Sequence, residues 1–201
     1  MSPAHTHFHT PAEIRSAAAA VGAALAEFLS YAIIGGGAYV MLGNARTTED
    51  IDFVVPRSET AAARRLLRAS ADFVVEPRTN RTTFRARDLD VPVDIEILAP
   101  PAMFKEPFDQ TTEVITVGGV KILKLALILN AKWRSWLDRP SVLKKNLDLI
   151  DICFLLKYCA QYPKHLPRVA EVPTQPKNSS NFLFKLTTTK TTGVVLGTTS
   201  I

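Results

Sequence analysis

The chain has 201 residues, of which 47% are apolar and 21% charged, a balance that excludes a disordered polypeptide and is typical of a globular protein with its own core. The net charge is +5, which weakly favours a polyanionic partner such as a nucleotide or a nucleic acid. No uncharged apolar run reaches the ~18 residues of a membrane span. The N-terminus lacks the pattern of a signal peptide, and a disulfide between Cys153 and Cys159 is disfavoured by their spacing on a predicted helix. We therefore expect a cytoplasmic protein with no membrane partner.

The first part of the chain alternates predicted helices and strands. Residues 1–9 contain three histidines but no fold signal, so we expect a flexible N-terminus. Thr10, Pro11 and Glu13 have the spacing of a helix start with a capping box. The predicted elements, in chain order, are a helix over residues 10–29, a strand over 31–34, a short helix over 38–42 and a buried strand over 51–55.

Further strands and two closing helices are predicted after this point. Ser58 and Ser141 are the predicted N-caps. The elements, in chain order, are a helix over 58–68 with Arg64, Arg65 and Arg68 on its solvent side, strands over 72–76, 82–87, 91–98 and 113–117, and helices over 121–136 and 142–158. Beyond residue 160 the prolines and the Thr-rich end show no periodicity, so residues 161–201 are predicted to be an irregular or flexible tail. Residues 10–160 then form one α+β domain, a mixed β-sheet flanked by helices, with helices at its C-terminal end.

Three consecutive glycines, Gly35 to Gly37, follow the first predicted strand. They fit a tight turn from strand to helix, because glycine adopts backbone conformations that other residues avoid. A dinucleotide-binding turn requires the spacing G-x-G-x-x-G, but position 40 is a valine. A third interpretation is a phosphate cradle, in which bare backbone N–H groups approach a triphosphate closely.

Asp50 and Asp52 are two residues apart on a predicted strand, so their side chains project from the same face. The intervening Ile51 and the following Phe53 are apolar, which places the pair at the end of a buried strand. Like charges held together there are unfavourable unless a cation neutralises them. Solvated aspartates in a turn are the alternative, but the cradle and the acids together favour a site for a metal and a phosphate.

Asp94 and Glu96 repeat this arrangement on a later predicted strand. Alternation on an edge strand with one solvated face would also explain them. Together with the first pair, however, they would bring three or four carboxylates to one site. Ligation by oxygen atoms alone is what Mg²⁺ or Mn²⁺ prefers.

At this point the sequence resembles the nucleotidyltransferase superfamily that includes DNA polymerase β. The shared pattern is G-G-x-A, a later glycine and R-x-T-x-D-I-D, here Gly35, Gly36, Ala38, Gly43, Arg46, Thr48, Asp50 and Asp52. The resemblance is strongest to small stand-alone members, including nucleotidyltransferases of the abortive-infection type. Those also have a lysine in a helix after the core, similar to Lys124, and a later K-x-x-D-x-x-D-like helix, loosely similar to Lys145, Asp148 and Asp151.

The resemblance implies a metal-dependent nucleotidyltransferase of the same fold. Such an enzyme moves NMP from an NTP such as ATP to an acceptor hydroxyl, with pyrophosphate as the leaving group. Asp50 and Asp52 would hold two Mg²⁺ or Mn²⁺ ions, which lie ~3.5–4 Å apart in such sites. Asp94 best matches the third carboxylate, which would bind the metal on the nucleophile side and help to deprotonate the acceptor. Glu96 is the alternative ligand, since it shares the face.

The resemblance also implies a nucleotide site, formed by Gly35, Gly36, Arg46, Thr48 and Lys124. The two glycines would hold the triphosphate, and Arg46 or Lys124 would offset its charge. A structural salt bridge from Arg46 to Glu49 or Asp50 is an alternative, and Lys124 would otherwise extend its ammonium group from an apolar helix to water.

The resemblance implies an acceptor that is RNA, a protein or a small molecule, and the sequence does not distinguish them. Arginines at positions 78, 81, 85 and 87, around a predicted hairpin, would contact an RNA backbone or form a solvated strand face. A non-catalytic nucleotide-binding relative, or an interaction module with the same fold, is the alternative function.

Overall fold

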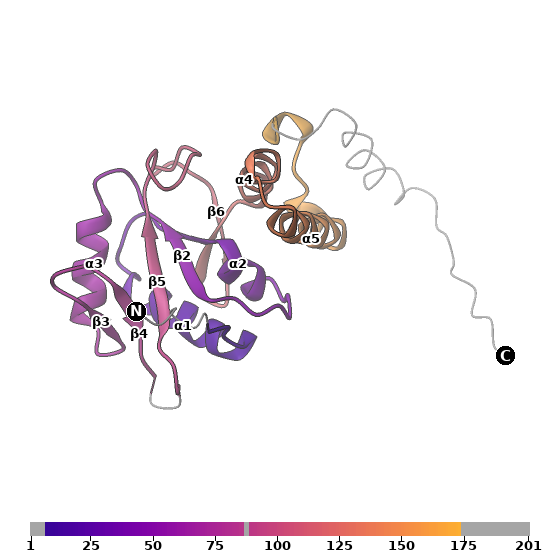
Figure 1. The fold of residues 1–201 in the computed structure, drawn as a ribbon. Helices are drawn as coiled ribbons and strands as arrows, with labels where there is room; N and C mark the ends of the chain where they lie inside the picture. The colour runs from indigo at the N-terminus through magenta and orange to yellow at the C-terminus, as the bar shows by residue number, and fades with distance from the viewer. Residues whose placement is uncertain (1–6, 87–88, 174–201) are drawn as a thin grey trace. The chain divides into compact units, whose positions relative to one another are not determined.

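The computed structural model describes residues 7–86 and 89–173, and its strands form a seven-stranded mixed sheet (Figure 1). The strand order is β3-β4-β5-β2-β1-β7-β6. The β1–β7 and β2–β5 pairs are parallel, and the other neighbouring pairs are antiparallel. The strands are Ala32–Ile34 (β1), Asp50–Val54 (β2), Phe73–Val75 (β3), Thr82–Phe84 (β4), Val93–Leu98 (β5), Val114–Val117 (β6) and Val120–Leu123 (β7).

The described chain also contains α-helices, so the fold belongs to the α+β class, as the sequence predicts. The α-helices are Pro11–Ala24 (α1), Gly35–Met41 (α2), Thr60–Ala69 (α3), Leu125–Asp138 (α4) and Val142–Gln161 (α5). Two short 3₁₀ helices follow, Pro163–His165 and Val169–Glu171. Within the described ranges, no helix has both the length and the apolar character needed to cross a membrane.

His9, the last residue of the N-terminal segment predicted to be flexible, is held in the fold. His9 is buried and forms a β-bridge with Thr48, whose carbonyl oxygen accepts a hydrogen bond from His9 N at 2.8 Å. The capping box of α1 is present as predicted, since Thr10 Oγ1 accepts from Glu13 N and Thr10 N donates to the Glu13 carboxylate. Residues 1–6 lie outside the described part of the chain.

The prediction of a helix beginning at residue 121 was wrong at its start. Residues Val120–Leu123 form β7, which pairs with β6 through a turn at Gly118 and Gly119 and runs parallel to β1. Both glycines have positive φ angles, which suit a tight hairpin. The apolar run of this segment satisfies strand and helix periodicity alike, so pairing with β1 and β6 decides the outcome.

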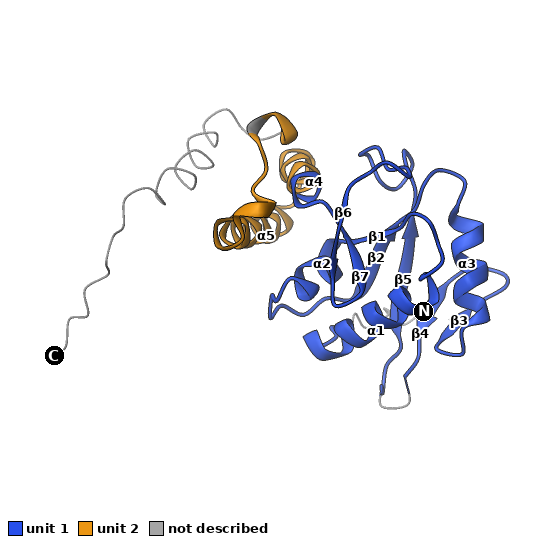
Figure 2. Cartoon of the chain, turned by 180° about the vertical axis from the view of Figure 1, so that it is seen from behind, with its two compact units in different colours: residues 1–128 blue, residues 129–201 orange. Residues whose placement is uncertain are grey.

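The chain divides into two compact units, residues 1–128 and 129–201, with the boundary inside α4 (Figure 2). The domain predicted over 10–160 therefore includes parts of both units. The first residues of the predicted tail are folded: two 3₁₀ helices follow α5, and Val172 is fully buried. Residues 174–201 lie outside the described part.

The central strands β2 and β5 have one buried face and one polar face. Ile51 and Phe53 on β2 and Val93 and Ile95 on β5 are buried. In β2 and β5 the alternate positions carry acidic side chains that are half-buried or exposed. Because successive side chains of a strand point to opposite faces, the buried positions fix the acids on the other face.

Candidate active site

The register of β2 and β5 places four carboxylates on one face of the sheet. Asp50 is the partner of Asp94, and Asp52 is the partner of Glu96. The carboxylate oxygens of Asp50, Asp52 and Glu96 come within 4.8 Å of one another. Asp50 and Asp52 are half-buried and Glu96 is exposed. The three form the acidic cluster of the site.

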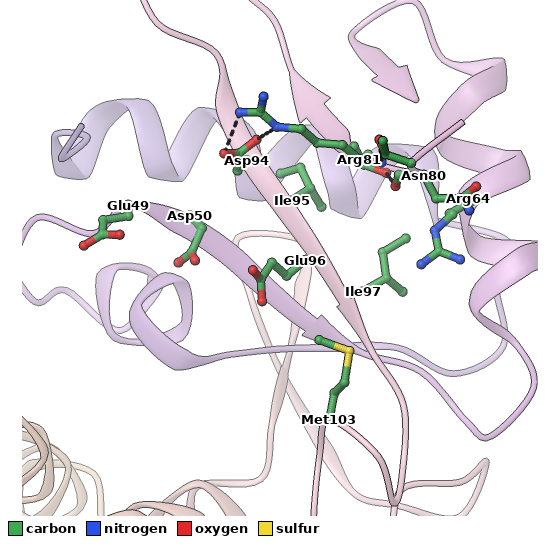
Figure 3. A pocket seen from close by; sticks show the side chains of 12 residues that line it. Glu49, Asp50, Arg64, Asn80, Arg81, Asp94, Ile95, Glu96, Ile97 and Met103 are labelled. Carbon is green, nitrogen blue, oxygen red and sulfur yellow. Dashed lines mark hydrogen bonds and ion pairs between the residues drawn. The ribbon is translucent and has the colours of Figure 1, made fainter. Parts of the chain in front are cut away.

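Asp94, which the resemblance favours as the third carboxylate, is paired with Arg81. Nε and Nη2 of Arg81 donate to the two carboxylate oxygens of Asp94, each at 2.9 Å (Figure 3). Arg81 directly precedes β4, which pairs with β5, so its side chain reaches Asp94 from the neighbouring strand. The geometry thus brings Glu96, rather than Asp94, to Asp50 and Asp52.

Burial and neighbouring acidic side chains raise the pKa of Asp50. Burial has the largest effect, followed by the negative charges of Glu96, Glu49 and Asp94, and together they raise the pKa to about 6. The positive charge of Arg46 acts in the opposite direction. The carboxylate of Asp50 is therefore held in an environment that favours either a proton or a cation.

The glycines of the first motif lie directly beside the acids. A side chain at Gly35 would collide with the carboxylate of Asp52, and one at Gly36 would collide with the side chain of Thr48. Gly35 also has a φ of +57°, a conformation that glycine adopts readily. The glycines therefore allow α2 to begin against β2, next to the acidic cluster.

The other residues predicted to bind the nucleotide have different surroundings. Thr48 is buried, and its carbonyl oxygen accepts from His9. The guanidinium of Arg46 lies 5.9 Å from the centre of the Tyr39 ring, and its charge lowers the pKa of Asp50. Lys124 directly follows β7 and pairs with Glu113.

A cavity of about 490 Å³ begins at the acidic cluster and extends over β5 (Figure 3). Asp50 lies toward one end, Arg64 of α3 lies at the other, and Glu96 lies between them. The remaining lining residues are Glu49, Thr79, Asn80, Arg81, Thr82, Asp94, Ile95, Ile97 and Met103.

The donor set of the acidic cluster fits a hard divalent cation. Its three side chains offer only carboxylate oxygens, which Mg²⁺ and Mn²⁺ prefer. The raised pKa of Asp50 shows that the site disfavours uncompensated negative charge. A bound cation would relieve this repulsion and leave coordination positions for other oxygen ligands.

Sequence reasoning missed the roles of two arginines. Arg64 was predicted on the solvent side of its helix, but it is half-buried and lines the cavity. The helix buries Ala63 and Leu67, and Arg64 borders that stripe, which is the signal that could have found it. No sequence signal identifies the pairing of Arg81 with Asp94, because it depends on the register of β4 and β5. Arg87, another arginine of the predicted hairpin, lies outside the described residues.

No protein-family model and no curated protein sequence matches the chain. Solved structures with a similar fold include two proteins. An antigenic nucleotidyltransferase-like protein from Paracoccidioides brasiliensis aligns with a TM-score of 0.62 at 23% identity, over 92% of this chain and 89% of that chain. The protein JHP933 from Helicobacter pylori aligns with a TM-score of 0.56 at 21% identity, over 88% of this chain and 76% of that chain. The chain therefore has the nucleotidyltransferase-like fold that its motifs predict.

Proposed function

We propose that the protein is a metal-dependent nucleotidyltransferase that moves NMP from an NTP to an acceptor hydroxyl. One observation carries this proposal: Asp50, Asp52 and Glu96 bring their oxygens within 4.8 Å of one another on a fold of the nucleotidyltransferase type. A chain that had lost such an activity would gain nothing from holding three like charges together, because their repulsion destabilises the folded state.

In this proposal, Asp50, Asp52 and Glu96 hold the divalent ions, Mg²⁺ or Mn²⁺. When bound, such ions stabilise the charge of a transferring phosphoryl group and hold the attacking and leaving oxygens. Glu96 replaces Asp94 as the third ligand, since both oxygens of Asp94 accept hydrogen bonds from Arg81.

The reaction forms a bond between the acceptor oxygen and the α-phosphorus of the NTP. The bond from that phosphorus to the oxygen bridging to the β-phosphate breaks, and pyrophosphate leaves with the electron pair. The acceptor proton passes to a carboxylate, for which Glu96 is best placed because it is exposed and lines the cavity.

The nucleotide phosphates are proposed to lie on the other side of β2, near the glycines. Gly35 and Gly36 lack side chains where α2 meets Asp52 and Thr48, which brings the backbone at the start of α2 directly against the acidic cluster. Arg46 offsets negative charge at the same site, as its effect on Asp50 indicates. Lys124 is proposed to contact the phosphates by exchanging its partner Glu113 for them.

The test is release of pyrophosphate from each of the four labelled NTPs, with Mg²⁺ or Mn²⁺ and a cell extract that supplies acceptors. We expect one NTP to be consumed and the reaction to stop with a chelator. Glu96→Gln should lower the rate by about 100-fold or more, because even outer-sphere changes at metal sites cost 10–100-fold. Asp94→Asn is the matched control on the same strand face and should change the rate by less than about fivefold.

Two results would contradict parts of this proposal. Binding of a non-hydrolysable NTP without any turnover would make the protein a nucleotide-binding relative rather than an enzyme. A large effect of Asp94→Asn with a small effect of Glu96→Gln would restore Asp94 as the third carboxylate.

A further inference from the structure

The end of the cavity farthest from the acidic cluster contains a cation that has no ionic partner among residues 7–86 and 89–173. Arg64 lies on α3, next to the buried Ala63, and its side chain is half-buried. Its Nε atom is buried, and no described residue accepts a hydrogen bond from it. Arg81, the other arginine of the cavity, is instead paired with Asp94.

An arginine in this state indicates a missing anion. A buried donor of a charged group without an acceptor destabilises the fold, and the few such groups in native structures call for an explanation. Figure 3 shows Arg64 apart from Glu49, Asp50 and Glu96, so the acids do not neutralise it. Exposed Asn80 and Thr79 line the same cavity and provide further polar groups.

The strand order separates this end of the cavity from the glycine turn. β2 lies between β1, which leads into Gly35 and Gly36, and β5, which forms the cavity wall. Neither glycine lines the cavity. The glycine turn and the cavity therefore lie on opposite sides of β2, next to the acidic cluster that they share.

We propose that the cavity binds the acceptor, that this acceptor carries a phosphate group, and that Arg64 binds that phosphate. This inference rests on the proposed nucleotidyl transfer, since it assigns the second substrate of the same site. The acceptor hydroxyl lies at the acidic cluster and its phosphate at Arg64. A guanidinium matches phosphate geometry with two parallel N–H groups. A cavity of about 490 Å³ has the size of sites for small molecules.

Two kinds of acceptor share this chemistry: a small phosphorylated sugar or nucleotide, and the terminal nucleotides of an RNA strand. The test measures binding with EDTA and without NTP, so that it does not depend on catalysis. The probes are ribose 5-phosphate, by calorimetry, and a fluorescein-labelled single-stranded oligoribonucleotide, by anisotropy. Ribose without phosphate and an oligoglutamate peptide are the comparison ligands.

Arg64→Met and Arg65→Met are the matched variants, because both remove one positive charge from the same helix. Arg65 is exposed and does not line the cavity. We expect at least one phosphorylated probe to bind the wild type, and ribose not to bind. Arg64→Met should weaken binding by about tenfold or more, as expected for hydrogen bonds to a charged group. Arg65→Met should weaken it by less than about threefold. Binding of ribose 5-phosphate indicates a small acceptor, and binding of the oligoribonucleotide alone indicates RNA.

The inference is overturned if neither phosphorylated probe binds, if the two variants weaken binding equally, or if the oligoglutamate peptide alone binds through Arg64. If Arg64→Met does not fold, Arg64→Lys keeps the charge but loses the fork, and a loss of about threefold or more is expected. Pyrophosphate release without probe binding would contradict this inference but not the proposed function. Probe binding through Arg64 without pyrophosphate release would overturn the role of the ligand as an acceptor, together with the proposed function.

Discussion

Asp50 carries a carboxylate whose ionised form is disfavoured by burial and by the charges of Glu96, Glu49 and Asp94. Its pKa is raised from 3.8 to about 6 in the folded protein. The folded state therefore holds the Asp50 proton more tightly than the unfolded state does. This contribution to stability is fully present below pH 3.8 and is lost as the pH rises through about 6.

Asp50→Asn removes this titration at nearly constant shape. Without metal, we expect the variant to be more stable than the wild type at pH 7.5 by about 1 kcal/mol, a value reduced because water screens a half-buried group. At pH 3.5 the carboxyl is mostly protonated in both the folded and the unfolded state, so the gain should largely disappear. Urea unfolding with EDTA at the two pH values measures the difference. Glu27→Gln, at an exposed carboxylate that is not among the charges acting on Asp50, is the control. A loss of stability of Asp50→Asn at both pH values would show that Asp50 is a structural residue.

Single residues also show the limit of sequence reasoning about the site. Asp50 and Asp52 were predictable, because strand alternation among buried residues places them on one face. Asp94 and Glu96 share that face too, so alternation alone does not distinguish them. The choice depends on Arg81, whose contact with Asp94 requires the register of β4 against β5.

At the scale of elements, α4 and α5 are joined by a buried ionic cluster in the second unit. Nζ of Lys132 on α4 lies 2.9 Å from Asp148 and 2.8 Å from Asp151, both on α5. The two aspartates are at most 2% exposed. Arg139 Nε lies 2.7 Å from the second oxygen of Asp148. Charges this deeply buried are stable only while they remain paired.

Lys132→Met should therefore destabilise the protein by about 3–5 kcal/mol, because it leaves two buried carboxylates with too little positive charge. The measurement is chemical unfolding followed by far-UV circular dichroism. Lys157→Met, on the exposed side of α5, is the control and should change stability by less than about 0.5 kcal/mol. Adding Asp151→Leu to Lys132→Met should recover part of the loss. Equal effects of the two lysine variants would mean that the cluster is energetically unimportant.

Helix α5 and strand β7 show which elements a sequence predicts well and which it does not. α5 begins at Val142 as expected, because the side chain of Ser141 accepts a hydrogen bond from Lys144 N, and a cap is a local signal. Residues 121–123 of β7 were predicted as helix. Their strand conformation depends on hydrogen bonds to β6 and to β1, which is far away in the sequence, and such pairing leaves no local signal. Local chemistry therefore fixed the helix start, and nonlocal pairing fixed the strand.

At the scale of the whole molecule, the sheet order explains why one motif requires both glycines and acids. β2 is central, with the glycine turn after β1 on one side and β5 on the other. Asp52 contacts the first side through Gly35 and lies beside Glu96 on the second. In the proposed function, a metal at Asp50 and Asp52 would thus contact the nucleotide and the acceptor at once.

This arrangement predicts that metal and nucleotide stabilise the protein cooperatively. A divalent cation lowers the repulsion of the acids, and an NTP supplies phosphate oxygens to the same cation, so each ligand should strengthen the binding of the other. With Mn²⁺ and a non-hydrolysable NTP together, the increase in melting temperature should exceed the sum of the increases that each ligand causes alone. A coupling of about 1–3 kcal/mol corresponds to about 2–12 °C for a chain of this length. Differential scanning fluorimetry measures the shifts, with the corresponding nucleoside, which lacks phosphates, as the control ligand. Asp50→Asn should remove most of the excess. If the two shifts in melting temperature merely add, or if the nucleoside has the same effect as the NTP, metal and nucleotide bind at unrelated sites. The acidic cluster and the glycine turn would then not act together.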